Sequence, residues 1–449
     1  MEPFARETEP IAIPWGGQGE RLTLNLPGGW PRPETVWPDL SGILSDYPRA
    51  LGEALASPLG CGRIEDQVSA GSRVAIVVDD PSRWTPVKEA LPLLLDRLRA
   101  AGVNDRDIKI VAGVGRHHPL DEAGFRGRVG AEVFERYPCL SPPVDKLSEY
   151  VNLGITPGGV PVRVYRPVAE ADLRILVGSV LPHLQAGFGG GYKLIFPGTS
   201  HRSTLGALHR KGIGPGADAG RLLGGESGTN PMRIAIGEAA RLLGPCLSIS
   251  HLLGAPGQVL SVKAGRPEPV QEELSREARR RFRAPEAALA DLVVAGNHPW
   301  PGDPMQSFKV LLQHRAACRA GGVLVGFFWT ESHEIDRSFP LPAMKLIAAT
   351  GTLGGWALRR GLKLADRAAA ALGSPAAFMV HWARELVVDR TVLVYAPLLF
   401  DKIGPTLGPV RLFGNQKTLW RAAENALGTE IAPQVRVFPQ GGLTYVSAK

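Results

Sequence analysis

The stretch Arg73-Val-Ala-Ile-Val-Val-Asp-Asp80 decides the fold of this 449-residue chain. A nearly unbroken run of β-branched residues is typical of a strand that is buried on both faces, as in parallel sheets. Thr85-Pro86 then offers an N-cap and a first-turn proline, residues 87–101 have apolar side chains at helical spacing, and Gly102 ends the helix. Because a second strand follows at residues 107–112, this segment predicts a right-handed βαβ unit.

The same alternation of strands and helices recurs along the chain. Further strands are predicted at residues 172–180, 259–264, 290–296, 321–328 and 391–396, and helices at residues 48–56, 231–243, 269–283, 304–320 and 416–427. The sequence therefore predicts an α/β protein that is built from parallel-sheet βαβ units.

The pattern restarts near residues 283–288, which predicts a domain boundary. We expect an N-terminal α/β domain at residues 1–284 and a C-terminal α/β domain at residues 285–430. Residues 431–449 are expected to form tail strands that pack back on the N-terminal domain. A cleft between domains is a common place for a ligand, so we expect the active site in the interdomain cleft.

The composition excludes several classes of protein. Apolar residues make up 44% of the chain and charged residues 21%, as in an ordinary globular protein. The net charge of +8 is mild, and the arginine cluster at residues 272–283 is typical of a solvated helix face rather than of a nucleic-acid surface. The four cysteines form no CxxC pair, so neither a zinc ribbon nor a redox motif is expected.

The sequence also lacks membrane and export signals. No apolar run reaches the roughly 18 residues of a membrane helix, and the acidic start of the chain has no apolar signal-peptide core. We therefore expect a cytoplasmic protein with no membrane partner and no nucleic-acid partner. The oligomeric state stays open.

Polar residues follow three predicted strands directly: Asp80 and Arg83 after the first, His117 after the second and His183 after the third. Ligands of open α/β sheets bind beyond the carboxyl ends of strands, so these side chains converge if the strands are neighbours. Two histidines suit acid–base chemistry near neutral pH, and an arginine can clamp a carboxylate or a phosphate. Taken singly, each has a simpler explanation, because a loop histidine is often structural and an aspartate can cap the next helix.

A glycine-rich stretch, Gly189-Gly-Gly-Tyr-Lys193, follows the third strand. Glycines let a backbone approach a ligand closely, so the lysine can be presented to whatever this loop holds. The phosphate-loop pattern GxxxxGK[ST] fails, because Leu194 follows the lysine. Two alternatives stay open for Lys193: a Schiff-base lysine of a pyridoxal enzyme, or a lysine at a loop edge without a special role.

His209 lies on a predicted helix that begins near residue 204. A neutral histidine ring can ligate a metal, but no second ligand stands beside it at metal-site spacing, so a zinc site built by the protein alone is not expected. A metal that a cofactor brings needs only one protein ligand. The alternative is a histidine on a helix surface.

In the predicted C-terminal domain, Gln306 and Lys309 lie three residues apart near a helix N-terminus. They share one helix face, at the end where anions are favoured. Ordinary surface polarity is the alternative explanation.

Together and in this order, these segments resemble those of the nickel-pincer lactate racemases and related 2-hydroxyacid racemases and epimerases. Residues 79–86, Asp-Asp-Pro-Ser-Arg-Trp-Thr-Pro, resemble the family pattern DDxTRPTP, and residues 115–120, Gly-Arg-His-His-Pro-Leu, resemble GTHRPL. The resemblance continues at Pro182-His183, Gly189-Gly-Gly-Tyr-Lys193, Ile195-Phe-Pro-Gly198, His209 and residues 306–309.

The resemblance implies two α/β domains with the active site between them, and it implies a cofactor. This is the nickel-pincer nucleotide, pyridinium-3,5-bisthiocarboxylic acid mononucleotide nickel, attached covalently at Lys193 in the N-terminal domain. Gly189, Gly190 and Gly191 would contact it, and His209 would be the protein ligand of the nickel. The enzymes that make this cofactor are then implied partners.

The resemblance further implies that the chain racemises or epimerises a 2-hydroxy acid. The α-hydride would move to the pyridinium ring and return on either face of a 2-oxo acid. His117 and His183 would be the two acid–base groups, one on each face of the substrate. The substrate-binding residues would be Asp80, Arg83, Gln306 and Lys309.

Three residues depart from the family pattern. Trp84 stands in place of a proline, His118 in place of an arginine and Met305 in place of a tyrosine. These departures favour a different or bulkier 2-hydroxy acid over lactate. Two other classes stay open: a cofactor-free binding or scaffold homologue, and a pyridoxal-type enzyme that uses Lys193.

Overall fold

The computed structural model describes residues 10–16, 19–115, 117–143, 145–213, 219–300, 304–338, 377–428 and 432–448, together with 345, 357, 360–362, 364–366 and 368. The chain divides into two compact units. Unit 1 consists of Met1–Pro38, Ala284–Leu372 and Met379–Lys449, and unit 2 consists of Asp39–Arg283 and Gly373–Phe378. Both units contain mainly parallel sheets with helices, which confirms the predicted α/β class. The interdomain position of the site stays a prediction.

Unit 2 is built on a sheet with the strand order β13-β12-β9-β4-β5-β6. Its strands are β4 (Val74–Asp79), β5 (Ile108–Gly113), β6 (Cys139–Leu140), β9 (Leu173–Val180), β12 (Cys246–Leu253) and β13 (Val259–Gly265). β13 is antiparallel to β12, and the other neighbouring strands are parallel. Every residue of β4 and β9 is buried, as their nearly continuous apolar runs predict.

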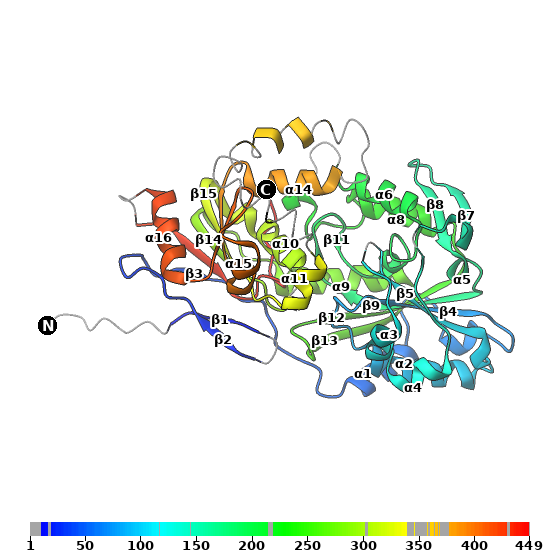
Figure 1. Ribbon diagram of the computed structural model, residues 1–449. Coiled ribbons are helices and arrows are strands. Elements are labelled where there is room, and N and C mark those ends of the chain that lie inside the picture. The colour runs from blue at the N-terminus through cyan, green and yellow to red at the C-terminus, as the bar shows by residue number, and fades with distance from the viewer. Residues whose placement is uncertain are drawn as a thin grey trace. The chain divides into compact units, whose positions relative to one another are not determined.

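Helices cover both faces of this sheet (Figure 1). Val74, Ile76 and Val78 of β4 pack in one core, whereas Ala75 and Val77 pack in the other, because successive side chains of a strand point to opposite faces. The first core is closed by α1 (Tyr47–Ala56), α2 (Val87–Ala100) and α3 (Glu122–Val129). The second is closed by α6 (Arg202–Lys211), α8 (Pro231–Ala240) and the hairpin of β7 (Tyr150–Ile155) and β8 (Pro161–Tyr165).

Unit 1 is built on a sheet with the strand order β17-β18-β16-β15-β14-β19-β3, in which only β17 is antiparallel to its neighbour. Its strands are β3 (Glu34–Thr35), β14 (Ala290–Gly296), β15 (Cys318–Phe327), β16 (Thr391–Tyr395), β17 (Thr406–Leu407), β18 (Val410–Phe413) and β19 (Val435–Phe438). The helices α10 (Pro304–His314) and α16 (Gln416–Leu427) contact this sheet. Within the described residues, no helix is both long and apolar enough to cross a membrane.

The two ends of the chain differ from the predicted domain division. β19 lies between β14 and β3, so it is an inner strand of the unit 1 sheet and not a tail on the N-terminal domain. Residues 1–38 also belong to unit 1, because β3 pairs with β19 and the side chains of Ile13 and Leu24 pack in the core of this unit. The predicted boundary near residue 284 agrees with the start of the second unit 1 segment.

Three local predictions need correction. The Thr85 hydroxyl donates to Asp79 Oδ2 at 2.6 Å and does not cap α2, whose N-cap is Pro86. The helix predicted at residues 304–320 ends at His314, and β15 begins at Cys318. β12 and the β7–β8 hairpin were not predicted, because polar residues interrupt their apolar runs.

The position of β19 predicts the effect of a core truncation. Phe438 is fully buried, and its ring centroid lies 4.2 Å from that of His314 on α10. Phe438→Ala should lower the free energy of unfolding of unit 1 by about 3–5 kcal/mol, because the lost contacts leave a cavity. Urea unfolding measures this change. The control Leu289→Ala, at a side chain that is 57% exposed, should stay within about 0.5 kcal/mol, and equal losses in the two variants would contradict an inner strand.

Candidate active site

The residues predicted at strand ends lie along one edge of the unit 2 sheet. Asp80 follows β4, His117 follows the neighbouring β5, and His183 on β10 (Pro182–His183) follows β9 on the other side. β4 and β5 end level, since Asp79 pairs with Gly113, whereas Val78 pairs with Val177 of β9 and β9 continues to Val180. Adjacent strands are about 4.8 Å apart, so the chain segments that carry the two histidines leave the sheet roughly 10 Å apart. A small ligand fits this spacing.

Asp80 and His117 form a hydrogen-bonded pair. His117 Nδ1 lies 2.9 Å from Asp80 Oδ1, and the Asp80 side chain is 12% exposed whereas the imidazole is 40% exposed. Burial opposes ionisation of Asp80, but the His117 charge and hydrogen bond, together with Arg83, hold the pKa of this carboxyl well below its usual range. The carboxylate therefore accepts from Nδ1–H, and the open Nε2 is the nitrogen that can exchange a proton with a ligand.

A buried arginine holds the loop that carries Asp80 and Arg83. Arg128 of α3 donates from Nε to the carbonyl oxygen of Asp79 at 3.0 Å, and from Nη1 to those of Arg83 and Thr85 at 3.0 and 3.1 Å. Its Nη2 also pairs with the Asp79 carboxylate. The two adjacent aspartates therefore have different partners: Asp79 binds Arg128 and anchors the loop, and Asp80 binds His117.

Lys193 lies on a short 3-10 turn, η4 (Gly191–Leu194), that contacts β4 and β9. Two glycines permit this close approach: a Cβ at Gly198 would lie 1.9 Å from the Leu194 carbonyl oxygen, and a Cβ at Gly113 of β5 would lie 2.9 Å from the same atom. In addition, the Gly115 N–H donates to the Gly198 carbonyl at 2.8 Å. The segment that follows the Lys193 turn is thus bonded to the loop that bears His117.

A second buried arginine holds the glycine-rich segment before Lys193. Arg233 of α8 is 8% exposed. Its guanidinium donates to four backbone carbonyls, those of Ala186, Phe188, Gly189 and Gly190. Burial lowers the pKa of Arg233 to about 10, so the side chain stays charged at neutral pH. This cation fixes the path of the chain between His183 and Lys193.

His209 on α6 has one ring nitrogen committed to the backbone. Its Nδ1 lies 2.8 Å from the Leu205 carbonyl oxygen, one helical turn earlier, so Nδ1 carries the proton and Nε2 keeps a lone pair. This is the usual state of a metal-ligating histidine, whose other N–H donates to a carbonyl or a carboxylate. Gln185 Nε2 donates to the His209 carbonyl at 3.0 Å, which ties this helix to the His183 segment.

Gln306 and Lys309 lie in unit 1, on the first turns of α10. Lys309 Nζ donates to Gln306 Oε1 at 2.7 Å and lies 5.7 Å from the ring centroid of Trp382. The buried Asn297 positions this helix, because its Nδ2 donates to Ser307 Oγ and to the Trp329 carbonyl, each at 2.8 Å. The predicted pair therefore shares one helix face, as expected from its spacing.

Three other predicted residues are less informative. The His118 side chain is exposed. Trp84 Nε1 donates to the Gly254 carbonyl at 2.8 Å, so this indole braces the turn between β12 and β13. Arg116 and the side chain of Met305 lie outside the described residues. Elsewhere in the described chain, no group of three or more His, Cys, Asp or Glu side chains could hold a metal.

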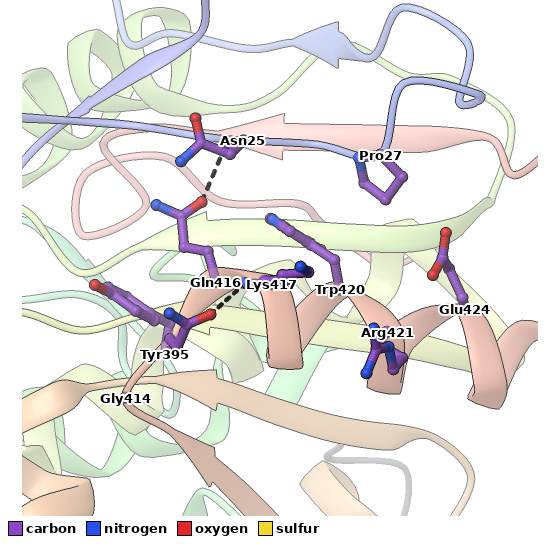
Figure 2. Close-up of a pocket in the computed structure, with 10 residues that line it drawn as sticks. Asn25, Pro27, Tyr395, Gly414, Gln416, Lys417, Trp420, Arg421 and Glu424 are labelled. Atoms are coloured by element: carbon purple, nitrogen blue, oxygen red, sulfur yellow. Dashed lines mark hydrogen bonds between the residues drawn. The ribbon is translucent and has the colours of Figure 1, made fainter.

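A separate pocket of about 600 Å³ lies in unit 1, at the start of α16 (Figure 2). Asn415 Oδ1 already accepts from the N–H groups of Lys417 and Thr418, so the helix end is capped. In the pocket wall, Gln416 Oε1 accepts a hydrogen bond from the Asn25 N–H at 3.0 Å. None of the predicted site residues lines this pocket.

Sequence reasoning missed the three buried anchors Arg128, Arg233 and Asn297. Only Arg233 left a signal, because it is the one charged residue in the apolar run Pro231–Ile236 at the start of α8. A lone arginine in such a run is seldom buried unless it is paired.

The fold and these contacts define a class: a two-unit α/β protein with an aspartate–histidine pair, a second histidine and a lysine-bearing glycine turn at one edge of a parallel sheet. Residues 39–220 match the lactate racemase N-terminal domain family. Over these residues the chain is similar to the lactate racemase family.

Individual proteins show the same similarity. The chain is 26% identical over 325 residues to the lactate racemase of Thermoanaerobacterium thermosaccharolyticum. The aligned residues span 70% of this chain and 73% of that protein. It is 24% identical over 277 residues to the lactate racemase of Lactiplantibacillus plantarum. Here the aligned residues span 61% of this chain and 64% of that protein.

Two solved structures share the fold. The lactate racemase apoprotein of T. thermosaccharolyticum superposes with a TM-score of 0.77 at 19% identity and covers 97% of this chain and 99% of its own. A Thermotoga maritima protein superposes with a TM-score of 0.62 at 12% identity and covers 86% of this chain and 96% of its own. At these identities the likeness concerns the fold alone.

The Arg233 anchor predicts a local loss of order. Arg233→Met should lower the free energy of unfolding by at least about 2 kcal/mol, because buried carbonyls lose their donors, and should speed hydrogen exchange at residues 186–191. The free energy of unfolding of Arg233→Lys should lie between those of the wild type and Arg233→Met, because lysine keeps the positive charge but lacks the planar guanidinium with its several donors. Arg241→Met, at an exposed position at the end of the same helix, is the control. Unchanged exchange at residues 186–191 in Arg233→Met would refute the anchor.

Proposed function

We propose that this chain is an isomerase that racemises or epimerises a 2-hydroxy acid, with a nickel-pincer nucleotide attached at Lys193. One observation carries the proposal: β9, β4 and β5 bring His183, Asp80 and His117 to one sheet edge, and the segment that follows the Lys193 turn is bonded to the same edge. The family match at residues 39–220 supports it. The cytoplasmic location and the cofactor-making enzymes as partners belong to the same proposal.

The chain's own residues account for binding and proton handling. Arg83 and Lys309 neutralise the substrate carboxylate, and Gln306 and Asp80 line the site. His117 and His183 are the acid–base groups for the substrate hydroxyl. The hydroxyl proton must leave when the α-hydride leaves, and it must come back when the hydride returns.

The donor set fits the proposed cofactor. Lys193 supplies an amine on the turn that follows Gly189 and Gly190. A Cβ at Gly190 would lie 2.9 Å from the Ser179 carbonyl oxygen and a Cβ at Gly191 would lie 3.0 Å from Gln271 Oε1, so these glycines let the lysine-bearing turn pack closely against the protein. His209 offers an Nε2 lone pair, because its Nδ1–H is bound to a carbonyl. When bound, this cofactor supplies a hydride acceptor that a protein side chain cannot provide.

The substrate is proposed to be a 2-hydroxy acid other than lactate, or one bulkier than lactate. The motivation is the presence of Trp84 and Met305 where the family pattern has proline and tyrosine. The Trp84 indole is held by the Gly254 carbonyl, so it is a fixed part of the loop beside Arg83.

Removal of the nickel ligand tests the cofactor assignment. In protein made together with the cofactor-making enzymes, His209→Ala should lower the nickel content by at least about tenfold, because one of the metal's ligands is lost. The covalent adduct on the Lys193 peptide should stay visible by mass spectrometry, and circular dichroism should be unchanged. Arg210→Ala, at the next position on α6, serves as the control. Stoichiometric nickel in His209→Ala would remove this residue from the metal site.

A substrate panel tests the chemistry. Loaded wild-type protein should interconvert the enantiomers of at least one 2-hydroxy acid, as measured by chiral chromatography, with a higher kcat/KM for a bulkier acid than for lactate. Faster racemisation of lactate than of every other acid would refute the substrate proposal and leave the reaction class intact. A borohydride-reducible adduct on Lys193 without nickel would instead favour the pyridoxal alternative.

A further inference from the structure

The pocket at the start of α16 lies where parallel sheets commonly hold ligands. Tyr395, the last residue of β16, lines it, and so does Gly414, which follows the last residue of β18. These two strands are parallel neighbours, and ligands of open α/β sheets bind beyond the carboxyl ends of such strands. The opposite wall comes from the segment that carries Asn25 and Pro27 (Figure 2). At about 600 Å³, the pocket has the size of a small-molecule site.

The charges at this helix end oppose the usual preference. Helix N-termini favour anions, yet the first turn of α16 contains no acidic residue. Instead, two exposed cations of the pocket wall, Lys417 and Arg421, stand one turn apart on one helix face, where like charges repel. Within the described residues, neither of these side chains forms an ion pair. Among the described lining residues, the one acidic side chain is Glu424, about two turns from the helix start. An anion in the pocket would neutralise this positive end.

The buried Trp420 adds a donor that lacks a partner. This residue is 3% exposed and lines the pocket, and its Nε1–H has no hydrogen-bond acceptor among the described residues. Figure 2 shows the ring nitrogen directed toward the side of the pocket that holds Gln416 and Asn25. An indole can only donate, so the missing partner is an acceptor atom. Because a buried donor without an acceptor is costly, a ligand that supplies one gains affinity here.

Other polar groups at this helix end are already engaged. Asn415 Oδ1 caps the helix, and Gln416 uses both ends of its amide on the backbone near the start of the chain. Most of the groups left for a ligand are donors: the two cations, the Trp420 N–H and the hydroxyl of Tyr395. Burial raises the pKa of Tyr395, so this hydroxyl keeps its proton at neutral pH. The two aromatic rings and Pro27 supply the apolar part of the wall.

We propose that this pocket binds a small organic anion that has an oxyanion head, a carboxylate or a phosphate, and a flat apolar body. The head meets Lys417 and Arg421, the body packs on Tyr395, and an acceptor atom of the ligand completes the Trp420 N–H. An inorganic anion would neutralise the cations but would leave most of a pocket of this volume empty. The site consists of residues of unit 1 alone, and it does not depend on the proposed racemase function.

Indole N–H spectra test the pocket directly. The chain has 9 tryptophans, and the signal that is lost from the ¹H–¹⁵N spectrum of Trp420→Phe assigns Trp420. Phenylacetate and adenosine monophosphate carry the two kinds of head, each with a flat ring. At least one of them should move the Trp420 signal downfield in a saturable manner, and the one that does so identifies the head.

Two further ligands separate the head from the body. Benzyl alcohol lacks the charge and inorganic phosphate lacks the ring, so both should bind at least about tenfold more weakly than the responsive anion. No saturable shift with either organic anion up to about 10 mM would overturn the proposal. Inorganic phosphate that binds as tightly as the organic anion would overturn the assigned ligand class.

Charge variants test which residues recognise the anion. In titration calorimetry, the double variant Lys417→Gln/Arg421→Gln should raise the dissociation constant at least about tenfold, because charge-assisted hydrogen bonds are lost. Arg411→Gln, at an exposed arginine of β18 outside the pocket wall, is the matched control and should stay within about twofold. Trp420→Phe keeps a ring but lacks the N–H, so it should also bind more weakly. If circular dichroism shows that Trp420→Phe does not fold, the charge variants alone decide. Unchanged affinity in the double variant would place the anion elsewhere and overturn the site.

Discussion

The site of unit 2 depends on buried guanidinium groups that bind backbone carbonyls. A site made of loops needs its peptide groups held in place, and the strand pairing here is short, because β10 pairs only with the two-residue strand β11 (Gly187–Phe188). Arg233 holds the segment between His183 and Lys193, and Arg128 holds the segment between Asp79 and Thr85. Only arginine carries five donors in a rigid fork, so lysine could not make these contacts.

The two arginines meet the cost of burying a charge in different ways. Arg128 pairs with the Asp79 carboxylate, so its charge is neutralised directly. Arg233 is bound by carbonyl oxygens, and burial lowers its pKa to about 10, which keeps it charged at neutral pH. The C=O and N–H of one peptide group point in opposite directions. Because the Phe188 carbonyl faces Arg233, the Gly189 N–H of the same peptide group faces the other way and donates to the Leu181 carbonyl at 2.7 Å. The anchor therefore also fixes which donors face the far side of the loop.

Much of the fold could be predicted because its central strands are buried on both faces. β4 and β9 are nearly continuous apolar runs, and the residues after their ends could be placed at one edge by the general rule for parallel sheets. β12 was missed because Ser248, Ser250 and His251 interrupt its pattern, yet all three are buried. The two serine hydroxyls bond to each other at 2.7 Å and His251 bonds to the Gly178 carbonyl, and these partners, which allow the polar groups to be buried, exist only in the folded chain.

The protonation states of the histidines could not be predicted from the sequence, because they depend on the orientation of peptide planes rather than on residue type. His117 and His183 follow β5 and β9, the two strands that flank β4, and this symmetry favours two equivalent bases. The contacts break the symmetry: a carboxylate faces Nδ1 of one ring, and two N–H groups face Nδ1 of the other. A carboxylate stabilises an imidazolium, whereas backbone donors oppose it. The two rings therefore differ in their surroundings, and Asn230 and Arg233 at the start of α8 hold peptide groups beside His183.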